Sequence, residues 1–334
     1  MKKLRSSLKA LFLICALCLP FAEALAAEIK VTDVVSSEPV PAKPRVYRSG
    51  VFINRINSFD VKTGTAEVDL WYWVVCDDNG PKPSLKTLEL SNGKLEATGE
   101  LIEQHQDGKY YVSQRYIAEA KCRVDMSRFP FDQQKLVLSF EDSELTKEDM
   151  LFEPDTANSG IDKAFEMNEW EIKGIKYGVS SHHYPSNFGY LDTPSGKGSD
   201  YSQFTVEITL DRRGSSCQKL FKYFWAVVIS VIVGLFALLI RVCDLDGRFG
   251  MAVGALFANV GCSFLLSDKL PESPGVSVAE WVSYISLGFI MLFLVESIIS
   301  LAIYNSGREK LSRMIDYYVF GISTGLYIIM WFFV

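Results

Sequence analysis

The sequence is poor in histidine, a side chain on which many enzyme active sites depend. Its 334 residues include only three histidines, His105, His182 and His183. The adjacent pair is badly placed to hold one metal ion, because neighbours on a strand point to opposite faces, so we interpret all three as surface-loop residues. No CxxC pair lies near them, and no zinc spacing, nucleophile elbow or phosphate-binding loop is found. The sequence therefore predicts no enzyme activity, no metal site and no cofactor.

An excess of positive charge is also lacking. The formal net charge is −6, and residues 27–219 hold 31 acidic against 23 basic residues. An acidic domain does not suggest nucleic acid or an anionic membrane surface as a partner, but it does raise the local concentration of cations. We therefore expect no nucleic-acid partner.

The first residues have the pattern of an export signal. Four basic residues within positions 2–9 precede the apolar run of residues 10–19, and Ala24-Leu25-Ala26 supplies small residues for cleavage. An uncleaved membrane anchor is the alternative, which the shortness of the run disfavours. We expect residues 1–26 to be a signal peptide and the domain that follows to lie outside the inner membrane.

Most of the long apolar runs lie in the second half of the chain. We place four membrane-spanning helices at about residues 220–240, 249–268, 281–303 and 316–334, each close to the roughly 20 residues that a span requires. Bases in the connections after the first and third helices, among them Arg241 and Arg308, put these connections on the cytoplasmic side. Both mature termini then lie outside.

The first half lacks any long helical period and reads as strands. Segments such as TAEVDLWYWVV and QFTVEITL are rich in β-branched and aromatic residues and partly alternate, and Asn92-Gly93 and Asp107-Gly108 mark turns. We expect residues 27–219 to form an antiparallel β-sandwich. Its three cysteines, Cys76, Cys122 and Cys217, leave at least one thiol unpaired within the chain, and spacing does not select a pair.

Several short motifs follow one another along the chain. The most specific is the corner Phe129-Pro130-Phe131-Asp132; the others are FIN-I at residues 52–56, EW-I-G at residues 169–174, an arginine before the first span, LP after the second and VE inside the third. In their order and spacing these motifs resemble the pentameric ligand-gated ion channels of the Cys-loop receptor superfamily in their prokaryotic form. Cys122 matches the first cysteine of the family's loop, but Leu136 stands where the second would be, so this loop cannot close by that disulfide. The resemblance covers nearly the whole mature chain and implies a cyclic homopentamer.

The resemblance gives the aromatic corner a role. It implies that Phe129, Pro130 and Phe131 pack against the outer ends of the helices and the linker after the second span, and that Asp132 faces Arg213. The alternative is that this corner is a turn that only holds the sandwich together. The gating interface expected from the family comprises Phe129, Pro130, Phe131, Asp132, Arg213, Leu270 and Pro271.

The second span has one stripe of small, aromatic and acidic residues at helical spacing. The resemblance places a pore along Asp246, Gly250, Gly254, Phe257, Gly261, Phe264 and Asp268. Phenylalanine rings would narrow the bore, and rings of carboxylates would favour cations. The alternative is that the glycines pack against a neighbouring helix. The basic Arg248 is expected to point away from the lumen, and Glu296 is interpreted as an acid that reaches water or is protonated.

The family's agonists bind between subunits beneath a hairpin that corresponds here to about residues 182–201. Its aromatic rings suit a cationic amine, although they could equally only pack the hairpin. The expected ligand-binding residues are Trp71 or Trp73 and Tyr111 from the facing subunit, with Glu141, Tyr184, Phe188, Tyr190 and Tyr201.

These observations predict a β + α membrane protein in the bacterial inner membrane. It would be an ion channel, permeable to cations, opened by an agonist or by protons acting on the external domain. Its partners would be copies of itself, the lipid bilayer, inorganic ions and a small agonist. A non-conducting membrane receptor and a membrane-tethered enzyme are the alternatives.

Overall fold

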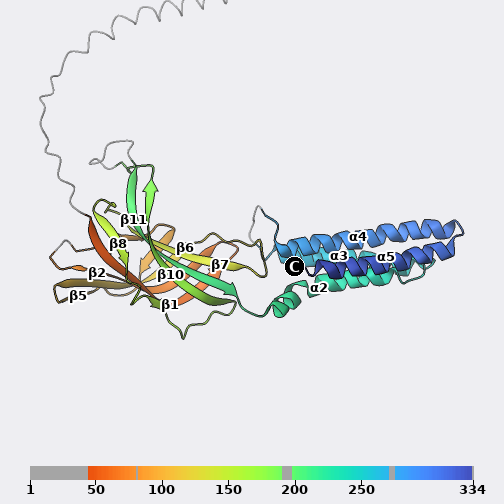
Figure 1. Ribbon diagram of the computed structural model, residues 1–334, viewed down its shortest axis with the longest axis horizontal. Helices are drawn as coiled ribbons and strands as arrows, with labels where there is room; N and C mark the ends of the chain where they lie inside the picture. Colours follow the sequence, from red (N-terminus) through yellow and green to blue (C-terminus); the bar gives the residue numbers. More distant parts are fainter. Residues whose placement is uncertain (1–43, 80–81, 190–197, 271–274, 333–334) are drawn as a thin grey trace, which may run out of the picture. The chain divides into compact units, whose positions relative to one another are not determined.

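Strands and helices occupy separate halves of the chain (Figure 1). The computed structural model describes residues 44–79, 82–189, 198–270 and 275–332. The expected signal peptide, Tyr190 and Pro271 lie outside the described residues. The predicted β-sandwich and the helices that follow it are both found.

The strands form two sheets. The first has the order β4 (Gly93–Ala97), β6 (Lys109–Lys121), β2 (Thr65–Asp77), β1 (Arg45–Asp60) and β8 (Met150–Pro154), with β5 (Ile102–Gln106) beside β6 and β9 (Gly160–Ile161) beside β1. The second has the order β10 (Trp170–Tyr184), β11 (Ser199–Arg212), β7 (Gln133–Asp142) and β3 (Leu88–Leu90). The sandwich was predicted to be antiparallel, but two of its strand pairs are parallel, because β1 pairs in parallel with β8 and β9.

Side chains from both sheets form one core. On β11, the alternate residues Phe204, Val206, Ile208 and Leu210 are fully buried, and the other sheet contributes residues such as Tyr72 from β2. The period of two in the sequence therefore marks the inner face of the strand correctly. Leu136 is also buried in this core, and Cys122 is a free thiol. Spacing had left open whether Cys122 pairs with another cysteine.

The second half of the described chain folds into four helices that pack side by side: α2 (Ser216–Ala237), α3 (Leu245–Ser267), α4 (Val278–Asn305) and α5 (Glu309–Met330) (Figure 1). All four helices begin before their predicted first residues. The predictions followed the apolar run, whereas the helical backbone begins at the capping residue, which precedes that run. Ser215 and Ser277 cap α2 and α4 through capping boxes with Gln218 and Glu280.

Three of these helices have the length and composition of membrane spans. Among the described residues, α2, α3 and α4 are long and apolar enough to cross a bilayer. The helix α5 carries Glu309, Lys310, Arg313 and Asp316 in its first turns, and it does not meet this criterion. The prediction of a fourth span therefore stays a prediction.

Candidate functional site

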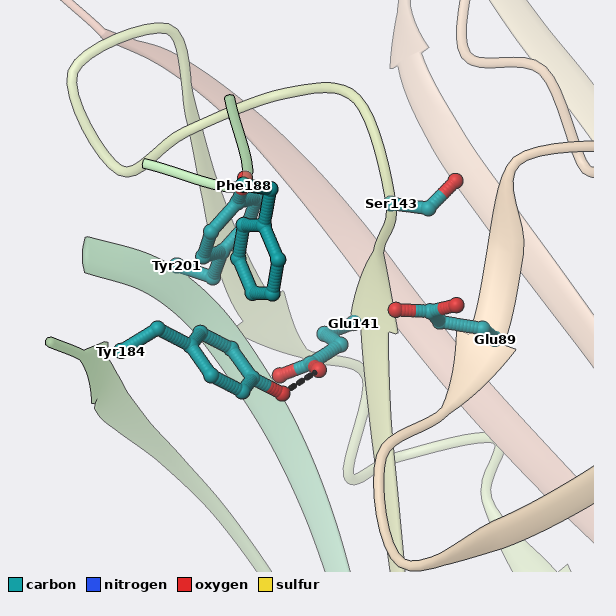
Figure 2. Close-up of a pocket in the computed structure, with 6 residues that line it drawn as sticks. All are labelled: Glu89, Glu141, Ser143, Tyr184, Phe188 and Tyr201. Atoms are coloured by element: carbon teal, nitrogen blue, oxygen red, sulfur yellow. Dashed lines mark hydrogen bonds between the residues drawn. The ribbon is translucent and has the colours of Figure 1, made fainter. Parts of the chain in front are cut away.

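A pocket lies on the outer face of the β10-β11-β7-β3 sheet. Its volume is about 340 Å³, and its lining combines aromatic rings with two acids: Glu89, Glu141, Ser143, Tyr184, Phe188 and Tyr201. In Figure 2 the three rings lie on one side of Glu141, and the Glu89 carboxylate lies on the other. Four of the side chains expected at a ligand site, Glu141, Tyr184, Phe188 and Tyr201, are thus brought together by the fold.

The two acids of this pocket face each other across neighbouring strands. Glu89 of β3 and Glu141 of β7 are direct partners in the antiparallel register, and Glu141 is only 1% exposed. Like charges that are directly opposite destabilise a sheet. Burial, together with the charges of Glu141 and Asp142, raises the pKa of the Glu89 carboxyl. The pocket therefore contains negative charge that a bound cation would compensate.

Polar contacts fix the orientation of Glu141. The Tyr184 hydroxyl donates a hydrogen bond to Oε1 of Glu141, and Nδ1 of His182 lies 3.3 Å from Oε2. Burial and the neighbouring Glu141 raise the pKa of Tyr184, so its hydroxyl keeps the proton that it donates. Neither contact partner carries a fixed positive charge, so the charge of Glu141 is not neutralised by them.

The histidines were wrongly predicted to lie in surface loops. His182 and His183 lie on β10 and His105 on β5. The expectation that the adjacent pair points to opposite faces is confirmed, because His182 contacts Glu141 whereas His183 contacts Asp200. Sequence reasoning therefore missed His182, and with it Glu89, whose place beside Glu141 depends on the register between β3 and β7.

The residues expected from a facing subunit lie on the other sheet. Trp71 and Tyr111 are half-buried on β2 and β6. Trp73 is 8% exposed and its Nε1–H donates to Asp155 at 3.1 Å, so it is packed within its own chain, which favours Trp71 of the two predicted alternatives. Trp71 and Tyr111 stay a prediction.

The aromatic corner packs against the helices. Phe129 is 2% exposed and joins Met126 in a cluster with the side chains Phe224, Val227, Leu266, Leu270, Ala279 and Val282 of the helical half. Its ring meets Tyr223 of α2 edge-on, with 4.9 Å between ring centres. Pro130 is buried and Phe131 is half-buried. The corner therefore contacts the helices, in addition to ending the loop before β7.

The partner of Asp132 is Arg212, and the prediction of Arg213 was wrong. Arg212 Nε lies 3.0 Å from Asp132 Oδ1 and Arg212 Nη2 lies 3.2 Å from Oδ2, with both residues buried. Arg213 instead donates to Glu166 at the exposed surface. Position 212 continues the even-numbered, core-facing residues of β11, and position 213 points away, since one step along a strand changes the face.

Two polar contacts complete the junction between the strands and the helices. Lys62, in the turn between β1 and β2, donates from Nζ to Asp268 Oδ1 at 3.1 Å. The backbone N–H of Val278, at the start of α4, donates to the Ser127 carbonyl at 3.0 Å. Asp268 was expected at the outer mouth of a pore, and Lys62 partly neutralises its charge.

One face of α3 is uncovered by the described part of the chain. Phe257 and Phe264 are 72% and 78% exposed. A Cβ built on Gly250, Gly254 or Gly261 would meet no atom within 4 Å. The stripe therefore does not pack against the other described helices of its own chain. Asp246 is exposed in the first turn of the same helix.

A charged cluster is buried where α3, α4 and α5 meet. The Arg248 guanidinium contacts the carboxylates of Glu296 and Asp316, and its Nε donates to Ser297 Oγ at 2.8 Å. All four residues are less than 5% exposed. As expected, Arg248 points away from the exposed face of α3. Glu296 is 4% exposed and contacts Arg248, so the interpretation that this acid reaches water was wrong, and the alternative that it is protonated stays a prediction.

Comparison with known families gives a match for the strand-forming half of the chain. The family model described as the neurotransmitter-gated ion-channel ligand binding domain matches residues 89–214. This segment runs from β3 to the end of β11 and includes the pocket, the aromatic corner and Arg212. The chain matches none of the curated proteins with which it was compared. The match confirms the predicted resemblance to the Cys-loop superfamily for residues 89–214, and the prokaryotic form stays a prediction.

Proposed function

We propose that the protein is a ligand-gated channel opened by a small organic cation, and the match of residues 89–214 to the neurotransmitter-gated ion-channel ligand binding domain supports this proposal. The observation that carries the proposal is the pair Glu89 and Glu141, opposed across two strands beside three aromatic rings. A cation relieves the repulsion between the two carboxylates and is attracted to ring faces.

The ligand would be held between two subunits. Tyr184, Phe188 and Tyr201 supply the rings from one chain, and Trp71 and Tyr111 of the neighbouring chain would close the site from the opposite side. The half-buried side chains of Trp71 and Tyr111 on the other sheet are partly accessible, which suits this role, whereas the indole of Trp73 is buried and donates to Asp155.

The strands of the pocket offer a direct route to the helices. The pocket end of β7 carries Glu141, and β7 begins directly after Asp132. Similarly, β11 carries Tyr201 near its start and Arg212 at its end. A shift of these strands on ligand binding therefore moves the Asp132–Arg212 pair and the Phe129 corner that contacts Tyr223.

The pore would be formed by five copies of α3 in a cyclic homopentamer in the bacterial inner membrane, with the sandwich on the external side. Its uncovered face, with Phe257, Phe264 and three glycines, supports this arrangement. The exposed Asp246 would form a ring of carboxylates that favours cations.

Current recording from the purified protein in planar bilayers tests the proposal. Choline is a suitable probe, since its quaternary ammonium is always charged, and 3,3-dimethyl-1-butanol is its uncharged isostere. We expect choline to open the channel, the isostere to be inactive, and Glu141→Gln to weaken the response to choline at least tenfold, about 1.4 kcal/mol. Equal responses to both compounds would contradict a cation site. Currents evoked by acid alone would favour protons as the agonist, and binding without current would favour a non-conducting receptor.

A further inference from the structure

The buried pocket acid Glu141 lies next to the titratable side chain of His182, which does more than orient the carboxylate. We propose that His182 makes a proton and the cationic ligand exclude one another at Glu141, so that acid antagonises the agonist. This inference rests on the proposed cation site and deepens it by naming the group that regulates it.

The geometry places His182 between solvent and the buried carboxylate. Its Nδ1 lies 3.3 Å from Glu141 Oε2, and its ring centre lies 4.1 Å from that of Tyr184. The side chain of His182 is 40% exposed, whereas that of Glu141 is 2% exposed. Protons from solvent therefore reach the imidazole directly, and Glu141 meets the resulting charge at hydrogen-bonding distance.

The charges around His182 decide the consequence. The groups that face it are Glu141 from β7, Tyr184 from its own strand, Tyr201, its register partner on β11, and Glu89, which lies beyond Glu141 on β3. None of the residues that line the described pocket is basic. With a neutral imidazole, the two carboxylates attract a cation. When the imidazole is protonated, the imidazolium of His182 pairs with Glu141. The positive charge of this imidazolium then lies beside the aromatic rings and disfavours binding of the ligand cation.

Imidazole is the side chain that ordinarily changes its charge between pH 5 and 8. If ligand binding requires this one group to lose its proton, the apparent Kd rises about tenfold between pH 8 and pH 5.5. A second titratable group, the carboxyl of Glu89, lies close by. The raised pKa of Glu89 means that this acid also loses its negative charge as the pH falls, which weakens cation binding in the same direction and must be separated from the effect of His182.

Binding of choline to the purified full-length protein, measured by isothermal titration calorimetry at pH 8 and pH 5.5, tests the inference. The ammonium of choline does not titrate, so any pH dependence comes from the protein. We expect about tenfold weaker binding at pH 5.5, and His182→Gln should remove most of this difference while it keeps a polar side chain next to Glu141. His183→Gln is the matched control, because His183 contacts Asp200 on the opposite face, and it should keep the full pH dependence.

Three results would overturn the inference. An unchanged pH dependence in His182→Gln would assign the titration to Glu89, and Glu89→Gln would then remove it. A wild-type Kd that is equal at both pH values would leave the cation site in place without a proton antagonist. An absence of choline binding at either pH would overturn the proposed cation site itself, and the inference with it. If His182→Gln does not yield folded protein by circular dichroism, His182→Asn makes the same test.

Discussion

Arg212 makes three contacts that hold the base of the sandwich together. Its guanidinium pairs with Asp132 and lies over the rings of Phe129 and Trp170, at 4.9 and 4.5 Å from their centres. It therefore links the end of β11, the start of β10 and the corner that contacts the helices. The side chain of Arg213, the next residue, instead makes an exposed ion pair with Glu166.

This difference predicts unequal effects of two neighbouring substitutions. Arg212→Ala leaves the buried Asp132 carboxylate without its cation, which costs roughly 3–5 kcal/mol, and it also separates the strands from the corner. We expect a lower melting temperature and a strongly reduced choline-evoked current. Arg213→Ala removes an exposed pair worth about 1 kcal/mol or less, and it should behave almost like the wild type in both measurements. The reverse order of effects would restore Arg213 as the coupling residue.

At the scale of the element, α3 has one face that is buried against other helices and one face that is uncovered. One face carries the buried Arg248, whose contacts with Glu296 and Asp316 fix α3 to α4 and α5. The other carries Phe257 and Phe264, which no described part of the chain covers. The buried cluster thereby determines which face of the helix is left for other subunits or for a pore.

Phe257 tests what that uncovered face does. If five phenylalanines exclude water from the bore, Phe257→Ser should wet the constriction and raise the resting current with the pentamer intact. Current recording together with size-exclusion chromatography measures both properties. Loss of the pentamer with no leak current would mean instead that Phe257 packs against a neighbouring subunit, where large-to-small changes cost about 3–5 kcal/mol.

At the scale of the whole molecule, the proposed cation selectivity would depend on charges that form rings only in the proposed pentamer. Asp246 is exposed in the first turn of α3 and has no ion-pair partner among the described residues. Asp268, at the other end of the helix, is paired with Lys62. A ring of unpaired carboxylates attracts cations more strongly than a ring whose charges are partly neutralised.

We therefore expect Asp246→Ala to move the reversal potential in a potassium chloride gradient most of the way toward zero. Asp268→Ala is the comparison at the opposite end, and its shift should be smaller because Lys62 already offsets its charge. A large shift for Asp268→Ala and none for Asp246→Ala would place the selective ring at the outer end of α3.

The sequence by itself determined the properties that repeat along a single element. Alternation in β11, the apolar runs of three helices and the Phe129-Pro130-Phe131 corner were all predicted, because burial follows the periodicity of one strand or helix. The resemblance to the family, and not a local pattern, pointed to Glu141 and to the aromatic residues of the hairpin. Neither kind of reasoning indicated their partners.

Only the tertiary structure decided which side chains meet. Glu89 faces Glu141 because of the register between β3 and β7, and Arg212 takes the place predicted for Arg213 because one residue along β11 changes the face. The cluster of Arg248, Glu296 and Asp316 depends on how three helices pack together. Contacts of this kind join segments far apart in the chain, and their geometry is fixed by packing between elements, which no local pattern specifies.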